Sequence, residues 1–303
     1  MKKLIVIVPY FGKPIKWLNF FLASCAKNSD VDWLIVSDFE ILHRPKNVHH
    51  LFITFESYRS YIATKLGIQP DWNQPYKLCD LKPALGFLHE DIVKNYDYWA
   101  FGDMDLVYGD ILEKYESLMK DYDIISSHTY LLAGHLSIFK VMNETNMLFT
   151  VIPNWKEALS SSSHLSFDEV VMTEMLVSHL PKFNRMEIKF SPQLIFDKKI
   201  NNQQLRIIFK EQYTTFFTNN WLMPNGVLTK PTTWTWDHGR LFHDAMPGNI
   251  LYGHFSFWNS ARYGDTSHPD SGIWNKSPEL IVSNIPYDDI QKFKVSKEGF
   301  LLI

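Results

Sequence analysis

An alternation of short apolar segments with longer amphipathic ones constrains the fold of this chain most strongly. Four short segments are rich in apolar, β-branched and aromatic residues, as expected of strands buried on both faces. They are LIVIVPY (4–10), DWLIVSD (32–38), HLFITF (50–55) and YWAFGD (98–103). Helix-like spacing marks residues 14–28, 56–67 and 81–96, with Pro14 suited to a first turn and Gly67 to a helix end. The alternation predicts an α/β fold with a mostly parallel sheet flanked by helices.

The remaining two thirds of the chain mix strand-like and helix-like patterns. Strands are expected at 121–128 and 134–140. A helix is expected at 166–180, where Ser166 and Glu169 have the spacing of a capping box.

The end of the chain is rich in strand signals. Residues 233–244 are typical of a hairpin turning near residues 237–239, and residues 249–259 of another strand. Neither an internal repeat nor a linker-like segment is evident. We therefore predict one domain, with a core over residues 1–180 and a C-terminal elaboration over residues 181–303.

Composition narrows the class of protein. The 303 residues, of which 46% are hydrophobic, suffice for a packed core. A formal net charge of −3 argues against nucleic acid or an acidic membrane as the main partner. Cys25 and Cys79 form no disulfide or zinc pattern, which favours a reducing cytosol.

The segment WAFGDMDLVYGDI (99–111) places Asp103 and Asp105 at the end of an apolar strand. Ligands bind at this edge of open α/β sheets, and alternate strand residues share a face. Two such carboxylates suit a hard divalent cation, whereas burying both unpaired would be costly. They are a candidate metal site, although Asp-x-Asp also occurs in solvated loops; Asp110 is expected to cap the next helix.

Four segments follow one another between residues 4 and 180: VIVPYFGK, YKLCDLKPALGFLHEDIVKNYDYWAFGDMDLVYGDI, GHLSIFK and FDE. Together they resemble the GT-A class of nucleotide-sugar-dependent glycosyltransferases, and more narrowly a bacterial group linked to surface polysaccharides. The resemblance implies a GT-A, Rossmann-like fold with Mn²⁺ or Mg²⁺ at the aspartate pair. Asp105 is then the expected direct ligand, Asp103 a ribose or water-mediated contact, and His254 a further ligand, unless His254 is a buried structural histidine.

The resemblance also implies contacts to the donor nucleotide sugar. Besides Asp103, the expected contacts are Pro9, Tyr10, Phe11, Lys13, Asp38, Asp80 and Lys82. An aromatic side chain would stack on the base, Asp38 would bind a uracil or ribose edge, and Asp80 and Lys82 would face the sugar. Alternatively, Lys13 is solvated, Asp38 ends a strand, and Asp80 favours the positive end of a helix dipole.

The resemblance also implies a catalytic base and contacts to the acceptor in later parts of the chain, with residues 181–303 on the acceptor side. A base must lie within hydrogen-bond reach of the acceptor hydroxyl, and Asp168 is preferred to Glu169 because Glu169 has the capping-box role. His135 and Trp258 are expected acceptor contacts. Asp168 as a helix cap and His135 as a structural residue are the alternatives.

The sequence thus predicts a cytoplasmic, metal-dependent enzyme that moves a hexose from a nucleoside diphosphate sugar, with UDP as the expected nucleotide, to a saccharide acceptor. By resemblance the product is a bacterial surface glycan such as capsule, lipopolysaccharide or O-antigen, and a lipid-linked acceptor would place the protein at the inner face of the cytoplasmic membrane. A metal-dependent phosphohydrolase and a non-catalytic carbohydrate-binding protein are the alternatives. The sequence leaves retention or inversion at the anomeric carbon open.

Overall fold

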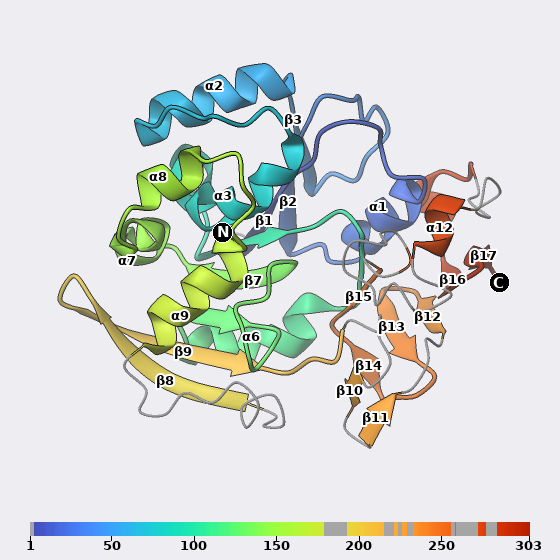
Figure 1. Cartoon of the computed structure of the whole chain (residues 1–303). Coiled ribbons are helices and arrows are strands. Elements are labelled where there is room, and N and C mark those ends of the chain that lie inside the picture. The colour runs from blue at the N-terminus through green and yellow to red at the C-terminus, as the bar shows by residue number, and fades with distance from the viewer. Residues whose placement is uncertain are drawn as a thin grey trace.

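An eight-stranded mixed sheet with the order β3-β2-β1-β4-β7-β6-β9-β8 lies at the centre of the fold (Figure 1). The computed structural model describes residues 3–178, 193–214, 221–223, 226–228, 233–255, 258, 272–276 and 284–303. The strands of the large sheet are β1 (Leu4–Pro9), β2 (Val31–Ser37), β3 (Val48–Phe52), β4 (Tyr98–Gly102), β6 (Ile124–Ser126), β7 (Leu136–Lys140), β8 (Gln193–Ile200) and β9 (Gln203–Lys210).

The half of the sheet built by the first third of the chain is parallel, as the apolar segments predicted. Strand β1 pairs in parallel with β2 and β4, and β2 with β3. The other half is mixed, because β7 is antiparallel to β4 and β6, and β8 is antiparallel to β9. Strand β9 is parallel to β6. Residues beyond 180 therefore extend the central sheet; the expected boundary itself, at 180–181, lies outside the described residues.

The alternation of side chains along β1 divides the core into two layers. Leu4, Val6 and Val8 belong to one buried cluster, which includes residues of the helices α1 (Leu18–Ala26) and α6 (Ile111–Asp121). Ile5 and Ile7 face the other cluster. Residues of α2 (Phe55–Leu66) and α9 (Met172–Val177) pack there, together with short helices. Burial on both faces explains why the strand is apolar throughout.

Several helix ends follow the expected chemistry. Gly67 ends α2 in the left-handed conformation, as predicted, and the Asp110 side chain caps α6 by accepting a hydrogen bond from the Glu113 N–H. Helix α1 begins at Leu18, so the prediction that Pro14 lies in its first turn is wrong.

The helix predicted over residues 81–96 is broken into short pieces. Pro83 lacks an N–H and falls in the 3₁₀ turn Lys82–Ala84, between α3 (Leu78–Leu81) and α4 (Leu85–Leu88). The other short helices are α5 (Glu90–Val93), α7 (Asn143–Asn146), α8 (Trp155–Ser160) and α12 (Ile273–Lys276), with further 3₁₀ turns at Pro75–Lys77, Leu148–Val151 and Tyr287–Asp289.

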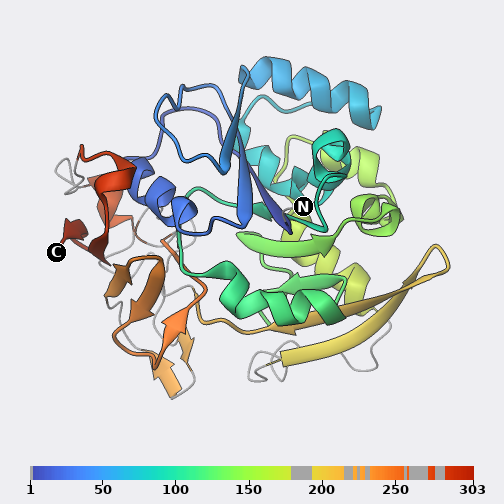
Figure 2. The same ribbon diagram turned by 180° about the vertical axis from the view of Figure 1, so that it is seen from behind.

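The C-terminal strands gather beside α1, as both ribbon views show (Figures 1 and 2). Their five-stranded antiparallel sheet contains β14 (Asn249–Ile250), β13 (Arg240–His243), β12 (Trp234–Asp237), β16 (Lys292–Ser296) and β17 (Gly299–Leu302). The predicted hairpin is confirmed: β12 and β13 are joined by His238 and Gly239, both at positive φ, as a two-residue type I′ turn requires. Strands β10 (Trp221–Met223) and β11 (Gly226–Leu228) form a separate pair.

Within the described ranges, none of the helices combines the length and the apolar character needed to cross a membrane.

Candidate metal centre and ligand pocket

A pocket of about 530 Å³ opens at the carboxyl ends of β1 and β4. This is the edge at which open α/β sheets bind their ligands. Of the residues predicted to form the site, it is lined by Pro9, Tyr10, Phe11, Lys82, Asp103, Asp105, His135, Asp168, Glu169 and His254. Residues distant in the sequence thus meet in one cavity.

Asp103, Asp105 and His254 each offer a ligand atom, and the three atoms lie within 4.8 Å of one another. The backbone explains how His254 reaches the aspartates. Strand β15 (Tyr252–His254) pairs antiparallel with β5 (Leu106–Tyr108), with His254 opposite Leu106. The Phe255 N–H also donates to the Asp105 carbonyl, 3.1 Å away.

Gly109 permits this close pairing. A Cβ atom on Gly109 would lie 2.3 Å from the Ile250 carbonyl oxygen, so no larger residue fits without a backbone shift. The Gly109 N–H donates to the Leu251 carbonyl at 2.8 Å. The strand predicted over residues 249–259 is therefore two short strands within the described part, 249–255, and residues 256, 257 and 259 lie outside the described residues. Strand β14 joins the C-terminal sheet, and β15 pairs with β5.

The electrostatics of the three side chains suit a divalent cation. Burial and the neighbouring Asp103 charge raise the pKa of Asp105 to about 7, against a smaller opposing effect of Lys82. Burial lowers the pKa of His254 to about 3, so its imidazole is neutral and offers a lone pair. Two carboxylates and a neutral imidazole fit Mn²⁺ or Mg²⁺, whose charge would favour the ionised form of Asp105.

The ring of His135 packs against the ring of His254. Its centroid lies 4.2 Å from that of His254, with the planes nearly parallel. His135 is 5% exposed, burial lowers its pKa well below the usual value, and its Nε2 has no hydrogen-bond partner among the described residues. The residue is thus a neutral imidazole at the pocket wall.

Lys82 lies between two acidic parts of the pocket, Asp103 on one side and Asp168 on the other. Its Nζ lies 2.6 Å from Asp103 Oδ1 and 3.9 Å from Asp168 Oδ2, and it donates to the Gly134 carbonyl at 2.7 Å. Burial alone would lower the pKa of Lys82, but Asp103 above all raises it beyond its usual value. Lys82 is therefore a charged ammonium that faces carboxylates.

Asp168 and Glu169 lie in a π-helical turn, Phe167–Val171, preceded by Ser166 at a positive φ of 50°. The predicted capping box is wrong, because Ser166 makes no cap hydrogen bond and Glu169 Oε1 instead accepts from the Gly134 N–H at 3.1 Å. Burial raises the pKa of Asp168 well above its usual value, although Lys82 opposes the shift. Such π-turns and strained residues often mark functional sites.

Gly134 brings the loop before β7 against these two carboxylates. A Cβ atom on Gly134 would lie 2.7 Å from both Asp168 Oδ2 and Glu169 Oε1. Only glycine permits this approach without displacing the acidic pair.

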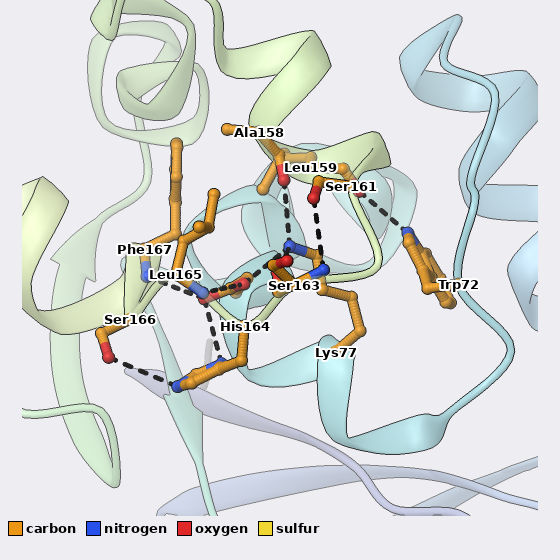
Figure 3. Close-up of polar contacts among 11 residues, drawn as sticks. Trp72, Lys77, Ala158, Leu159, Ser161, Ser163, His164, Leu165, Ser166 and Phe167 are labelled. Atoms are coloured by element: carbon orange, nitrogen blue, oxygen red, sulfur yellow. Dashed lines mark hydrogen bonds and ion pairs between the residues drawn. The ribbon is translucent and has the colours of Figure 1, made fainter.

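Asp80 does not face the pocket, which corrects the prediction that it contacts the sugar. It is fully buried, pairs with Lys77 Nζ at 2.7 Å, and accepts hydrogen bonds from the backbone N–H groups of Leu165 and Phe167. Lys77 in turn donates to two carbonyl groups of the segment that precedes the π-turn (Figure 3). Asp80 therefore anchors the segment that carries Asp168.

Trp258 is a core residue and not a pocket residue, which corrects its prediction as an acceptor contact. It is 1% exposed and packs against Trp234, Phe255 and Trp274 at ring-centroid distances of 5.2, 6.1 and 5.4 Å. Aromatic side chains contribute large areas to such cores.

Lys13 and Asp38 are exposed beyond the pocket lining. Asp38 Oδ1 accepts a hydrogen bond from the Gly12 N–H at 2.8 Å, which holds the loop after β1. Tyr10 contacts Phe39 edge to face, and Phe11 stacks on Tyr58.

Some lining residues were missed by sequence reasoning. They are Ile15, Pro75, Tyr76, Leu78, Cys79, Met104, His128, Tyr130, Leu131, Gly134, His164 and Ser166. His128 is the last residue of the predicted strand 121–128 and follows β6, so the strand-end rule that identified Asp103 could have found it. No local signal reveals its partner Glu211, whose Oε1 lies 3.2 Å from His128 Nδ1.

The fold and the three clustered ligands define an α/β protein with a candidate cation site in a ligand pocket. The chain belongs to the family described as "Family of unknown function (DUF6625)", which matches residues 6–268. No curated protein matches it. A solved structure of the galactosyltransferase LgtC with donor and acceptor sugar analogues aligns with 54% of this chain and 68% of its own, at 8% identity and a TM-score of 0.32. So low a TM-score does not establish a common fold.

Proposed function

We propose that this protein is a metal-dependent glycosyltransferase of the GT-A class. It would transfer a hexose from a nucleoside diphosphate sugar, with a UDP-sugar as first candidate, to a saccharide acceptor. The observation that supports this most is the convergence of Asp103, Asp105 and His254 in a pocket at the carboxyl ends of parallel strands. The resemblance of the sequence motifs to that class agrees with it.

In this proposal different pocket residues bind the metal ion and the nucleoside of the donor. Asp105 and His254 would hold Mn²⁺ or Mg²⁺ directly, and Asp103 would contribute through its remaining oxygen or through water. A bound divalent cation supplies positive charge for the departing diphosphate. Tyr10 and Phe11, which follow β1 and line the pocket, would receive the nucleoside.

Asp168 is the proposed base for transfer with inversion. Its carboxyl group lines the pocket, and burial raises its pKa well above the usual value, while Lys82 opposes this shift. Gly134 and Lys82 fix its position. Glu169, whose Oε1 is engaged by a backbone N–H, is the less suitable of the two.

The substitution Asp168→Asn should leave Mn²⁺-dependent nucleotide binding within about twofold of the parent while lowering turnover by about 10²-fold or more, because general-base catalysis contributes about 10²–10⁴-fold. Turnover is measured as nucleoside diphosphate release from a panel of nucleotide sugars with saccharide acceptors. Glu169→Gln is the matched control and should retain most activity. Parental turnover in Asp168→Asn would remove Asp168 as the base.

A phosphohydrolase fits the site less well. Two-metal hydrolases place additional carboxylate or histidine ligands around a second ion. Among the described residues, one group of three potential ligands is found. A non-catalytic glycan-binding protein would bind its ligand equally well with EDTA, which distinguishes it from the proposed transferase.

The proposed setting follows from the chemistry of nucleotide sugars and from the resemblance. The donor is a cytoplasmic metabolite, and a bacterial surface glycan is the proposed product. A lipid-linked acceptor would bring the protein to the inner face of the membrane. We also propose that residues 1–180 hold the donor, with His254 as the one metal ligand from beyond them, and that residues 181–303 otherwise contribute the acceptor side.

A further inference from the structure

The ammonium group of Lys82 is placed where it interferes with a free cation. The side chain is 5% exposed, and its Nζ lies 2.6 Å from Asp103 Oδ1, one of the three candidate ligands. The Gly134 carbonyl, at 2.7 Å, holds the same nitrogen from the other side. Lys82 therefore cannot move to bulk water without losing buried contacts.

A divalent cation at the aspartate pair would have to share the Asp103 carboxylate with this ammonium. Like charges a few ångströms apart repel, and the repulsion is stronger where burial lowers the local dielectric, as it does around the Lys82 side chain, which is 5% exposed. Further negative charge between the cation and the ammonium would relieve this repulsion. A diphosphate supplies that charge, since its oxygens can lie between a cation and an ammonium.

We propose that Lys82 suppresses the binding of a free divalent cation, so that the site takes up the cation together with a diphosphate. The diphosphate part rests on the proposed function, whereas the effect on the free cation rests only on the contacts of Lys82. Binding of the cation and of the nucleotide is then coupled, and each raises the affinity of the other. Lys82, which the sequence predicted as a donor contact, would thus also ensure that the donor binds together with its divalent cation.

The test is a titration of Mn²⁺ alone, followed by electron paramagnetic resonance of the free ion, with no nucleotide present. Lys82→Met should bind Mn²⁺ about tenfold or more tightly than the parent, because a repelling charge is removed and Asp103 is released. Lys82→Arg keeps the charge and should remain weak. Lys120→Met removes an exposed charge on α6 and is the matched control, with parental affinity.

Removing Lys82 leaves the buried Asp168 carboxyl group without its ammonium partner. An unpaired buried charge can prevent folding. The double substitution Lys82→Met with Asp168→Asn removes both charges and should also bind Mn²⁺ more tightly than the parent. The inference would be overturned if Lys82→Met and the double variant both bound Mn²⁺ no more tightly than the parent does. If the parent still binds UDP only with Mn²⁺, that result leaves the proposed function standing. Absence of Mn²⁺ binding in every variant, with UDP as well, would overturn both.

Discussion

The substitution Asp105→Ala is expected to abolish Mn²⁺-dependent nucleotide binding, with a loss of affinity of about a hundredfold or more, because a direct ligand is removed. Asp105 lies within 4.8 Å of the other two ligand atoms, and its Oδ1 is 3.7 Å from His254 Nε2. Titration calorimetry with UDP and Mn²⁺ measures the loss.

The fold should survive this substitution. Burial and the Asp103 charge disfavour the ionised form of Asp105, so its carboxylate contributes little to stability. The carbonyl group that receives the Phe255 N–H belongs to the backbone and remains. Circular dichroism and the unfolding midpoint should match those of the parent.

Asp110→Ala is the matched control from the same segment. Asp110 caps α6, so its loss should cost about 1 kcal/mol of stability while leaving nucleotide binding intact. Parental Mn²⁺-dependent binding by Asp105→Ala would eliminate the aspartate pair as the metal site.

The substitution Asp80→Asn should lower the free energy of unfolding by about 3–5 kcal/mol, since it leaves the buried Lys77 ammonium without its carboxylate. Both side chains of this pair are almost wholly buried, and the Asp80 carboxylate also accepts two backbone N–H groups. The segment leading to Asp168 would lose its anchor (Figure 3). Urea unfolding, followed by fluorescence and by circular dichroism, measures the change.

Asp38→Asn provides a control for Asp80→Asn, because Asp38 is an exposed aspartate with one backbone contact and its replacement should change stability by no more than about 0.5 kcal/mol. A sugar-contacting Asp80, as the sequence suggested, would instead show reduced donor affinity with unchanged stability. That outcome would refute the anchoring role.

The parallel half of the sheet could be predicted because its signal is local. Strands β1, β2 and β4 are short, mostly apolar runs, because burial on both faces requires such composition whatever the partners are. Strand β3 lies at the edge of the sheet and is largely exposed. The position of Asp103 and Asp105 follows directly, since they come immediately after β4. The sequence therefore predicted the edge of the sheet at which the candidate site lies.

Helix continuity was overestimated where tertiary contacts override the local pattern. Residues 81–96 have helical spacing, but the proline at 83 and the packing of Gly86 against Trp99 divide them. Ser166 resembled an N-cap, yet hydrogen bonds from Leu165 and Phe167 to Asp80 hold its surroundings in another conformation. A capping box is a local signal that such contacts can outweigh.

The remaining site residues depend on pairings that sequence spacing does not encode. His254 reaches Asp105 only because β15 pairs with β5. Trp258 and Asp80 carry side chains common at sugar sites, but their burial is decided by packing from distant segments. Residue type alone could not distinguish a pocket wall from a core.

Calorimetric titration of UDP, GDP and CMP into the full chain, first with Mn²⁺ and then with EDTA, tests the central claim most directly. The proposed site predicts that UDP binds with Mn²⁺ and that EDTA abolishes this binding. Failure of all three nucleotides to bind in the presence of Mn²⁺ would contradict the assignment of the pocket to a nucleoside diphosphate sugar.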